Sequence, residues 1–265
     1  MKVAGLLAAT VVAATPVSFV SSHQQADGGF AERGGRSSPA LTAWAVLGLA
    51  AATRPPGGAA AYLQSAPTSD ATDVALRVLA LHALGSDPTP MLAKLEALRR
   101  PSGRIGPLVN STIWGVLALR AARESVPSAS VRYVLRQQRP SGGWSWYERG
   151  APDSNDTAAA IEALRAAGVR GKPITRGLAY LRKQQGSDGG FGLVPRRASD
   201  SQSTAWAIQA FIAAGKKPPA RAFHFLARMR RRDGSYRYSA RYSVTPVWVT
   251  AQVLPALARK AFPFS

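Results

Sequence analysis

The chain has 265 residues and contains no cysteine, which excludes disulfide bonds and thiolate metal sites. Its 34 Lys and Arg residues outnumber its 14 Asp and Glu residues, so the formal net charge is +20 and we expect attraction to polyanions at low salt. Apolar residues make up 46% of the sequence, enough for one large core.

The first residues of the chain have the pattern of an export signal. Lys2 precedes an apolar run of Ala, Val and Leu that ends in small residues near Ala14. This run is too short to span a membrane but is typical of a cleaved signal peptide. We therefore expect residues 1–14 to be removed, residues 15–265 to form a single domain, and the protein to be extracellular, periplasmic or on the cell surface. If the run is instead part of the first helix, the protein is cytoplasmic.

A glycine turn closed by an aromatic residue recurs along the chain. In each copy, Gln (or Arg in the last) precedes the closing aromatic residue by six positions. The copies run from Gln24 to Phe30, from Gln138 to Trp144, from Gln185 to Phe191 and from Arg230 to Tyr236. A recurring unit of this kind indicates a repeat architecture.

An Ala-rich apolar segment that begins near a Thr follows each turn. These anchors are Thr42, Thr112, Thr157, Thr204 and Thr250. The last three are 47 and 46 residues apart (204 − 157 and 250 − 204), a length that suits two short helices and two loops. Apolar residues at helical spacing support helices, and strict strand-like alternation is missing.

Two weaker hairpins fill residues 53–124. The first combines 59–65 with 69–85 and has Thr72 as its anchor, and the second combines 89–100 with 110–123. The total is six helical hairpins. A hairpin cannot bury two apolar faces alone, so neighbours must stack on it. We predict an all-α fold in which the hairpins close into a ring, an α/α toroid.

The repeated turns resemble the QW motifs of the squalene-cyclase and prenyltransferase superfamily. The resemblance covers the chain after residue 15 and implies the same toroid fold. It does not imply one activity, because the superfamily includes terpene cyclases, protein prenyltransferases, cobalamin carriers and many secreted bacterial proteins of unknown role.

The segment Asp153-Ser-Asn155-Asp156-Thr157-Ala158 resembles the Asp-x-Asp-Asp-Thr-Ala motif of squalene-hopene and related class II cyclases. The middle Asp of that motif is the proton donor in the family, and here the position holds Asn155, whose amide cannot donate that proton. Asp153 and Asp156 are the candidate catalytic acids. The competing interpretation is helix capping, since similar polar residues begin several other repeats.

The repeats also predict a ligand site at one mouth of the ring. Two residues before a Thr anchor lie Asp70, Asn110, Asn155 and Gln202, and two residues after one lie Trp44, Trp114 and Trp206. We expect the first set to surround the mouth, and the tryptophans either to line a cavity or to pack between the helix layers. Arg77 and Glu162 follow their anchors by five residues, so they either face the cavity or are paired, because buried charges need partners.

Other chemistries find little support in the sequence. The three histidines lie far apart and no nucleotide-binding motif is present, so we expect neither a metal nor a cofactor. Arginines and tyrosines gather between Arg228 and Tyr242, where they form either a solvated face or a surface for anionic lipid or envelope polymer. Nucleic acid is a poorer partner for an exported protein.

The sequence thus favours an exported, monomeric and non-catalytic toroid that binds an apolar or amphiphilic ligand, such as an isoprenoid or lipid, or a partner. A terpene cyclase or isomerase that uses Asp153 or Asp156 as its acid is the first alternative. A cell-surface module that binds anionic polymers is the second.

Overall fold

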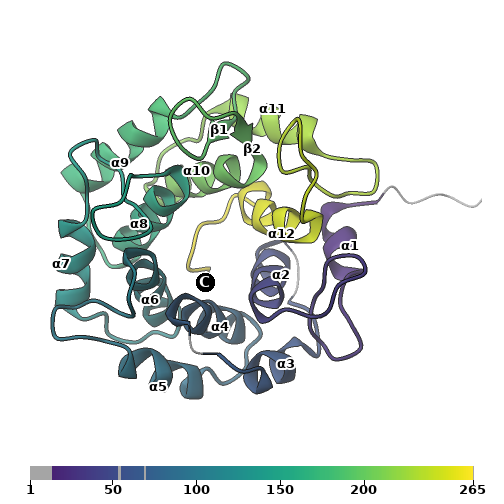
Figure 1. The fold of residues 1–265 in the computed structure, drawn as a ribbon, viewed down its shortest axis with the longest axis horizontal. Helices are drawn as coiled ribbons and strands as arrows, with labels where there is room; N and C mark the ends of the chain where they lie inside the picture. The colour runs from purple at the N-terminus through teal and green to yellow at the C-terminus, as the bar shows by residue number, and fades with distance from the viewer. Residues whose placement is uncertain (1–13, 53–54, 69, 265) are drawn as a thin grey trace, which may run out of the picture.

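The structure, a computed structural model, describes residues 14–52, 55–68 and 70–264. Its helices form two concentric rings (Figure 1). The outer ring contains α1 (Pro16–Ser21), α3 (Ala59–Ser65), α5 (Thr89–Ala97), α7 (Ser128–Arg136), α9 (Lys172–Lys183) and α11 (Ala220–Met229). The inner ring contains α2 (Pro39–Ala52), α4 (Ala71–Ala83), α6 (Val109–Ala121), α8 (Ser154–Ala166), α10 (Ser201–Ala213) and α12 (Pro246–Leu257). The predicted all-α toroid of six hairpins is confirmed.

Inner and outer helices differ in how many of their residues are buried. In α6, every residue except Arg120 is buried, because outer helices cover one side and the other side faces the lumen. In α9, by contrast, buried residues such as Ile174, Leu178 and Leu181 form one stripe at helical spacing. Alanines are frequent in α2, α4, α8 and α10 and let these inner helices pack closely.

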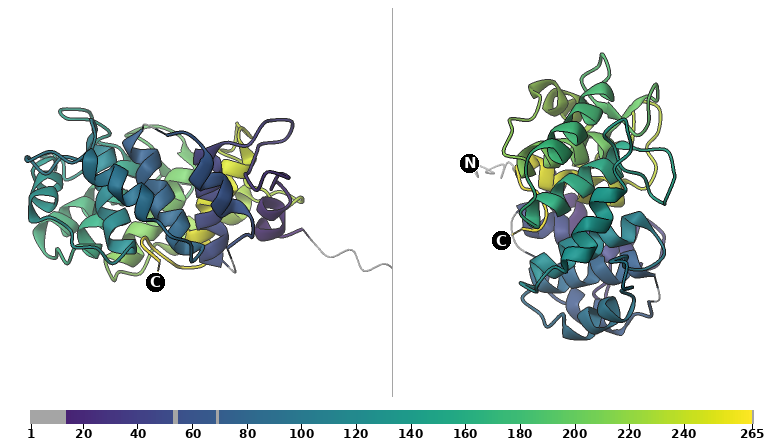
Figure 2. Two further views of the ribbon diagram at one scale, coloured as in Figure 1. Left: turned by 90° about the horizontal axis from the view of Figure 1, so that it is seen from below. Right: turned by 90° about the vertical axis from the view of Figure 1, so that its left-hand side faces the viewer.

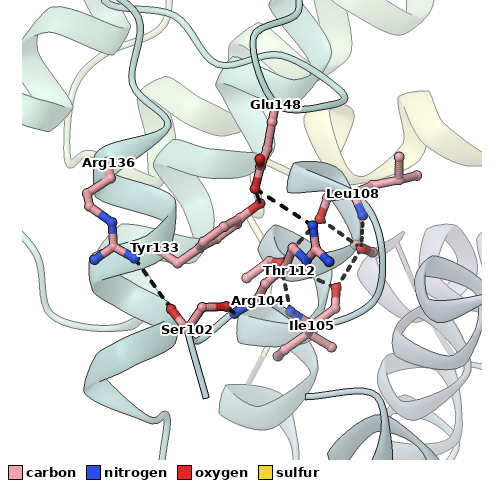
Figure 3. A network of polar contacts seen from close by, with 9 residues as sticks. Ser102, Arg104, Ile105, Leu108, Thr112, Tyr133, Arg136 and Glu148 are labelled. Atoms are coloured by element: carbon pink, nitrogen blue, oxygen red, sulfur yellow. Dashed lines mark hydrogen bonds and ion pairs between the residues drawn. The ribbon is translucent and has the colours of Figure 1, made fainter. Parts of the chain in front are cut away.

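The repeated Thr and Gln residues stabilise the glycine turns. The Thr hydroxyl of an inner helix accepts the backbone N–H of the residue that closes the preceding turn, as in Ile105 to Thr112 (2.9 Å, Figure 3) and Trp144 to Thr157 (2.9 Å). The Gln138 amide donates to the carbonyl of Gly142 in its own turn and to that of Pro173 in the next outer helix (both 2.8 Å). This turn is thereby joined to the neighbouring hairpin.

Strand structure among the described residues is short. Strands β1 (Phe191–Gly192) and β2 (Ser199–Asp200) pair antiparallel. Isolated bridges join Gln24 to Phe30, Gln185 to Phe191 and Arg230 to Tyr236 across the six-residue interval seen in the sequence.

The last hairpin packs against the first and closes the ring. Helix α12 lies against α2 (Figure 1), where Gly48 leaves room for the backbone of Ala251. Arg230 stands at the position of the repeated Gln and donates to the carbonyl of Ala14 (2.8 Å). Glu32 accepts the first-turn N–H groups of α12 at Val247 (3.1 Å) and Trp248 (2.9 Å).

The segment after α12 enters the ring from the face at which the inner helices end (Figures 1 and 2). Phe262 is 3% exposed, and its backbone N–H donates to the Glu162 carboxylate (2.6 Å). The C-terminal tail therefore blocks this end of the lumen, which leaves the opposite mouth for entry.

Residues 1–13, which hold nearly all of the expected signal, lie outside the described residues. In the part of the chain that is described, no helix combines the length and apolar character needed to cross a membrane.

Candidate functional site: a cavity in the ring

A cavity of about 410 Å³ opens at the face where the inner helices begin. Two layers of side chains line it, one from each inner helix in each layer. The outer layer holds Ala40, Thr72, Asn110, Asn155, Gln202 and Trp248, and the deeper layer holds Trp44, Leu76, Trp114, Ala159, Trp206 and Gln252. Within every helix the two lining residues are four positions apart, so they lie one above the other on the same face.

Three tryptophans close the middle of the lumen. Trp44, Trp114 and Trp206 contact one another edge to face, with ring centroids 5.3–5.6 Å apart. Phe262 packs beneath all three at 5.7–6.1 Å. Edge-to-face pairs of this kind are favourable beyond their burial of area. The cavity therefore has a rigid aromatic floor.

Hydrogen bonds join polar side chains across neighbouring helices above this floor. Asn110 donates through Nδ2 to Asp156 Oδ1 (2.6 Å) and accepts at Oδ1 from the Thr72 hydroxyl (3.0 Å). On the other side of the ring, Gln252 Oε1 accepts from Gln202 (2.8 Å) and from the Trp206 indole N–H (2.9 Å). These contacts fix the orientation of the rim before any ligand arrives.

Asp153 and Asp156 lie together at the start of α8. Asp153 caps the helix, because its Oδ1 accepts the backbone N–H of Asp156 (2.8 Å). Burial raises the pKa of Asp156 well above its ordinary value, the negative charge of Asp153 raises it further, and the Asn110 hydrogen bond opposes both. Burial also raises the pKa of Asp153, and its hydrogen bonds with Asp156 oppose that shift. Asp156 is therefore the member of the pair that retains its proton more strongly.

Asn155 lies in the outer layer of the cavity, next to Asp156 in the sequence. Its Oδ1 is buried and accepts no hydrogen bond from the described residues. A buried acceptor without a donor costs free energy, which a ligand that donates a hydrogen bond to this atom would recover.

Two loops complete the mouth of the cavity. Trp146 is 48% exposed and lines the opening, and its carbonyl accepts the N–H of Asn110 (3.1 Å). Glu148 of the same loop accepts the Tyr133 hydroxyl (2.7 Å) and lies 3.9 Å from Arg104, as Figure 3 shows. Leu193, from the loop between β1 and β2, lines the opening nearby. The loops place apolar surface at the entrance.

The structure brings together nine of the residues predicted for the site, Asp70, Asn110, Asp153, Asn155, Asp156, Gln202, Trp44, Trp114 and Trp206. The tryptophans do not pack between the two helix layers, which was one expectation. They point into the lumen and contact one another there.

The expected register of α4 was wrong by two residues. Asp70 caps α4 by accepting the N–H of Asp73 (2.9 Å), as Asp153 caps α8, so Val74 takes the place that Thr157 has in α8. No glycine turn precedes α4, and its Thr therefore has no turn N–H to accept. Thr72 moves into the outer layer, and Asp70 lines the mouth above it.

Arg77 and Glu162 do not line the cavity. Arg77 is fully buried, donates to the carbonyls of Leu63, Ala66 and Pro67, and pairs with Asp73 at 2.8 Å. Glu162 is also fully buried, and its carboxylate accepts the backbone N–H of Phe262 in the tail. Burial raises the pKa of Glu162 well above its ordinary value. Both therefore stabilise the scaffold, which corrects their prediction as ligand-binding residues.

Sequence reasoning missed Trp248 and Gln252. They lie two residues before and two after Thr250, the same positions that identified Asn110 and Trp114 around Thr112. Extending that rule to the last repeat would have found both.

The arginine cluster lies outside the cavity, and several of its members make local contacts. Arg228 donates to Asp188 O (2.6 Å) and Arg231 donates to Ser243 Oγ (2.8 Å). Binding of an anionic polymer at this surface stays a prediction. No group of three or more His, Asp or Glu side chains suited to a metal ion occurs among the described residues.

Comparison by sequence finds no matching family model and no matching curated protein. Comparison by structure finds the type II terpene cyclase MstE from Scytonema at 18% identity and a TM-score of 0.73, with 92% of this chain and 95% of the cyclase covered. A protein from Actinoplanes matches at 21% identity and a TM-score of 0.68, over 92% of this chain and 97% of that chain.

A third match is ent-copalyl diphosphate synthase from Streptomyces platensis, at 22% identity and a TM-score of 0.60, over 83% of this chain and 50% of the synthase. An aspartate-to-asparagine variant of the Scytonema cyclase was solved with its substrate geranylgeranyl dihydroxybenzoate bound. These likenesses show that the chain has the fold of the terpenoid cyclases.

Proposed function

We propose that this protein binds an apolar or amphiphilic molecule of isoprenoid size in the central cavity, without converting it. The observation that carries the proposal is the cavity of about 410 Å³, with its tryptophan floor and its rim of amides and carboxyls. Sites for small molecules combine such an apolar interior with a few polar groups that fix orientation. The apolar chain of the ligand lies on the floor, and its head group meets the rim.

Asn155 is the reason to favour binding over turnover. It stands where the resemblance to class II cyclases places the proton donor, and an amide cannot protonate an alkene. A ligand can occupy the cavity without that proton donor. The substrate-bound asparagine variant of the Scytonema cyclase supports this view, because a cavity of this fold retains an isoprenoid after an aspartate is replaced by asparagine.

The first experiment is native mass spectrometry of the protein from its own host, with organic extraction of anything bound. We expect a stoichiometric apolar or amphiphilic molecule. The purified protein is then titrated with geranylgeraniol and followed by tryptophan fluorescence, since Trp44, Trp114, Trp146, Trp206 and Trp248 line the cavity and only Trp144 lies elsewhere.

A matched pair of variants locates the bound molecule. Ala159→Phe places a ring in the deeper layer of the cavity, and Ala93→Phe makes the same change on the exposed face of α5. We expect Ala159→Phe to weaken binding at least about tenfold and Ala93→Phe to leave it unchanged. Because overpacking costs about 1–3 kcal/mol, circular dichroism must show that both variants fold. Equal affinities for the two variants would refute the cavity as the site.

A second candidate function is that of a terpene cyclase or isomerase, and the environment of Asp156 favours it. The raised pKa favours the protonated form of this carboxyl, which an acid catalyst needs, and the group lines a cavity whose tryptophan rings would stabilise a developing cation. Incubation with squalene or geranylgeraniol would then yield a cyclised isomer of unchanged mass, and Asp156→Asn would abolish it while the protein stays folded.

Variants of Asp153 and Asn155 separate the two candidates. If Asp153 serves only as a cap, Asp153→Ala costs about 0.5–2 kcal/mol of stability and leaves binding intact. Asn155→Asp restores the acid of the cyclase motif. Turnover that appears only in this variant would show that the wild-type cavity binds without catalysing.

A further inference from the structure

The charge of the cavity is opposite to that of the whole protein. The chain carries 34 Lys and Arg residues against 14 Asp and Glu residues, yet the described residues that line the cavity include four aspartates and no Lys, Arg or His. The aspartates are Asp70, Asp73, Asp153 and Asp156. The described lining thus carries negative charge and no positive charge, although the protein is strongly basic. This difference restricts which ligands can bind in the cavity.

Local pairing leaves part of this negative charge unbalanced. Asp73 forms a buried ion pair with Arg77 at 2.8 Å, which offsets its charge. Asp70 and Asp153 have no ion pair with a described residue. An anionic head group at the mouth would meet these two carboxylates without a cation to offset them.

The helix N-termini at the mouth do not supply a substitute for a cation. A free helix N-terminus attracts anions through its exposed N–H groups. Here Asp153 already accepts the N–H of Asp156 (2.8 Å), Asp70 accepts that of Asp73 (2.9 Å), and the carbonyl of Trp146 accepts that of Asn110 (3.1 Å). These donors are therefore already engaged.

An acceptor without a donor remains at the rim. Asn155 lines the cavity, and its Oδ1 is buried and accepts no hydrogen bond from the described residues. A ligand that donates a hydrogen bond would satisfy this atom. The indole faces of the floor and of Trp248 also attract a cation.

We propose that the preferred ligand is an amphiphile with a protonated amine as its head group, and that the cavity rejects phosphate and diphosphate heads. This inference rests on the proposed function, since it concerns the head group of a molecule whose chain occupies the cavity. The ammonium group lies between Asp153 and Asn155, with its chain on the tryptophan floor. Hydrogen bonds to an ionised partner are about twice as strong as neutral ones, so the amine is preferred over an alcohol of equal chain.

The test compares three probes that differ only in the head group, namely geranylamine, geraniol and geranyl phosphate. Tryptophan fluorescence and calorimetry are recorded at about 0.15 M salt, where screening weakens attraction of the phosphate to surface arginines. We expect geranylamine to bind at least about tenfold more tightly than geraniol, and geranyl phosphate to show no binding that geraniol displaces.

A pair of charge variants assigns the preference to the cavity. In Asp153→Asn the side chain still caps α8 but loses its charge, and we expect the affinity ratio of amine to alcohol to fall about tenfold. In Glu124→Gln an exposed residue after α6 loses the same charge, and we expect the ratio to stay unchanged.

The outcomes separate this inference from the proposed function. If geranyl phosphate binds as tightly as geraniol, or if Asp153→Asn leaves the ratio unchanged, the head-group inference is wrong while the apolar cavity stands. If Ala159→Phe does not weaken any probe, or if no probe binds, both proposals fail.

Discussion

The burial of Phe262 in the C-terminal tail predicts that removing its ring will lower the stability of the protein strongly. Its ring is 3% exposed and packs against Trp44, Trp114 and Trp206 with centroids 5.7–6.1 Å away. Replacing it with alanine removes the burial of a large apolar side chain and three aromatic contacts, and the rigid tryptophans above cannot collapse into the space. We expect Phe262→Ala to lower the free energy of unfolding by about 3–5 kcal/mol, as in other buried Phe-to-Ala changes.

The assay is equilibrium unfolding in urea, followed by circular dichroism. The control is Leu257→Ala at the end of α12, where the side chain is 37% exposed and the cost should stay below about 1 kcal/mol. If Phe262→Ala costs less than about 1 kcal/mol, the tail does not seal the lumen.

Three further predictions concern the closure of the ring and one buried carboxyl. In Gly48→Ala the added methyl group meets the backbone of Ala251, so α2 and α12 must separate, and we expect urea unfolding to show a loss of about 1–3 kcal/mol. In the full-length chain, which keeps Ala14, Arg230→Ala removes the hydrogen bond to the carbonyl of that residue and should speed hydrogen exchange in α1, whereas Lys172→Ala on the exposed outer surface should not. Burial raises the pKa of Asp200 from its ordinary value of 3.8 to about 6, so the contribution of Asp200 to stability is fully present below pH 3.8 and is lost as the pH rises through about 6. The loss is about 3 kcal/mol, since one pKa unit corresponds to about 1.4 kcal/mol. Asp200→Asn keeps the cap of α10 and escapes this loss, so its stability relative to wild type should rise by that amount between about pH 3.5 and pH 7.5. An unchanged difference between the two pH values would contradict the shift.

Periodic patterns made much of the fold predictable. Gln at six residues before an aromatic, followed by Thr, marks one hydrogen-bonded unit, because the Thr hydroxyl accepts the N–H of the residue that closes the turn. Both partners lie within about 15 residues, so local spacing encodes the contact. The weaker hairpin at 59–83 was found as well, although it lacks the turn. Its register was misplaced for that reason.

The site was predictable to the extent that it repeats. Because each inner helix presents the same two positions to the lumen, a rule based on the spacing from each Thr found six of the twelve residues in the two layers. It placed Arg77 and Glu162 wrongly, since their burial depends on contacts that no periodic pattern encodes. Arg77 is held by carbonyls of the α3 segment, and Glu162 binds a backbone N–H 100 residues away.

The sequence by itself determined the repeat, the helices, the ring and half of the inner-helix positions that face the lumen. All of these follow from residue spacing, which acts over one or two helical turns. Only the tertiary structure decided that the tryptophans meet as a floor, that Phe262 seals one end, and that aspartates without cations gather at the other. These features depend on side chains from six hairpins and the chain end meeting at the axis of one ring, and separations of that kind leave no local signal in the sequence.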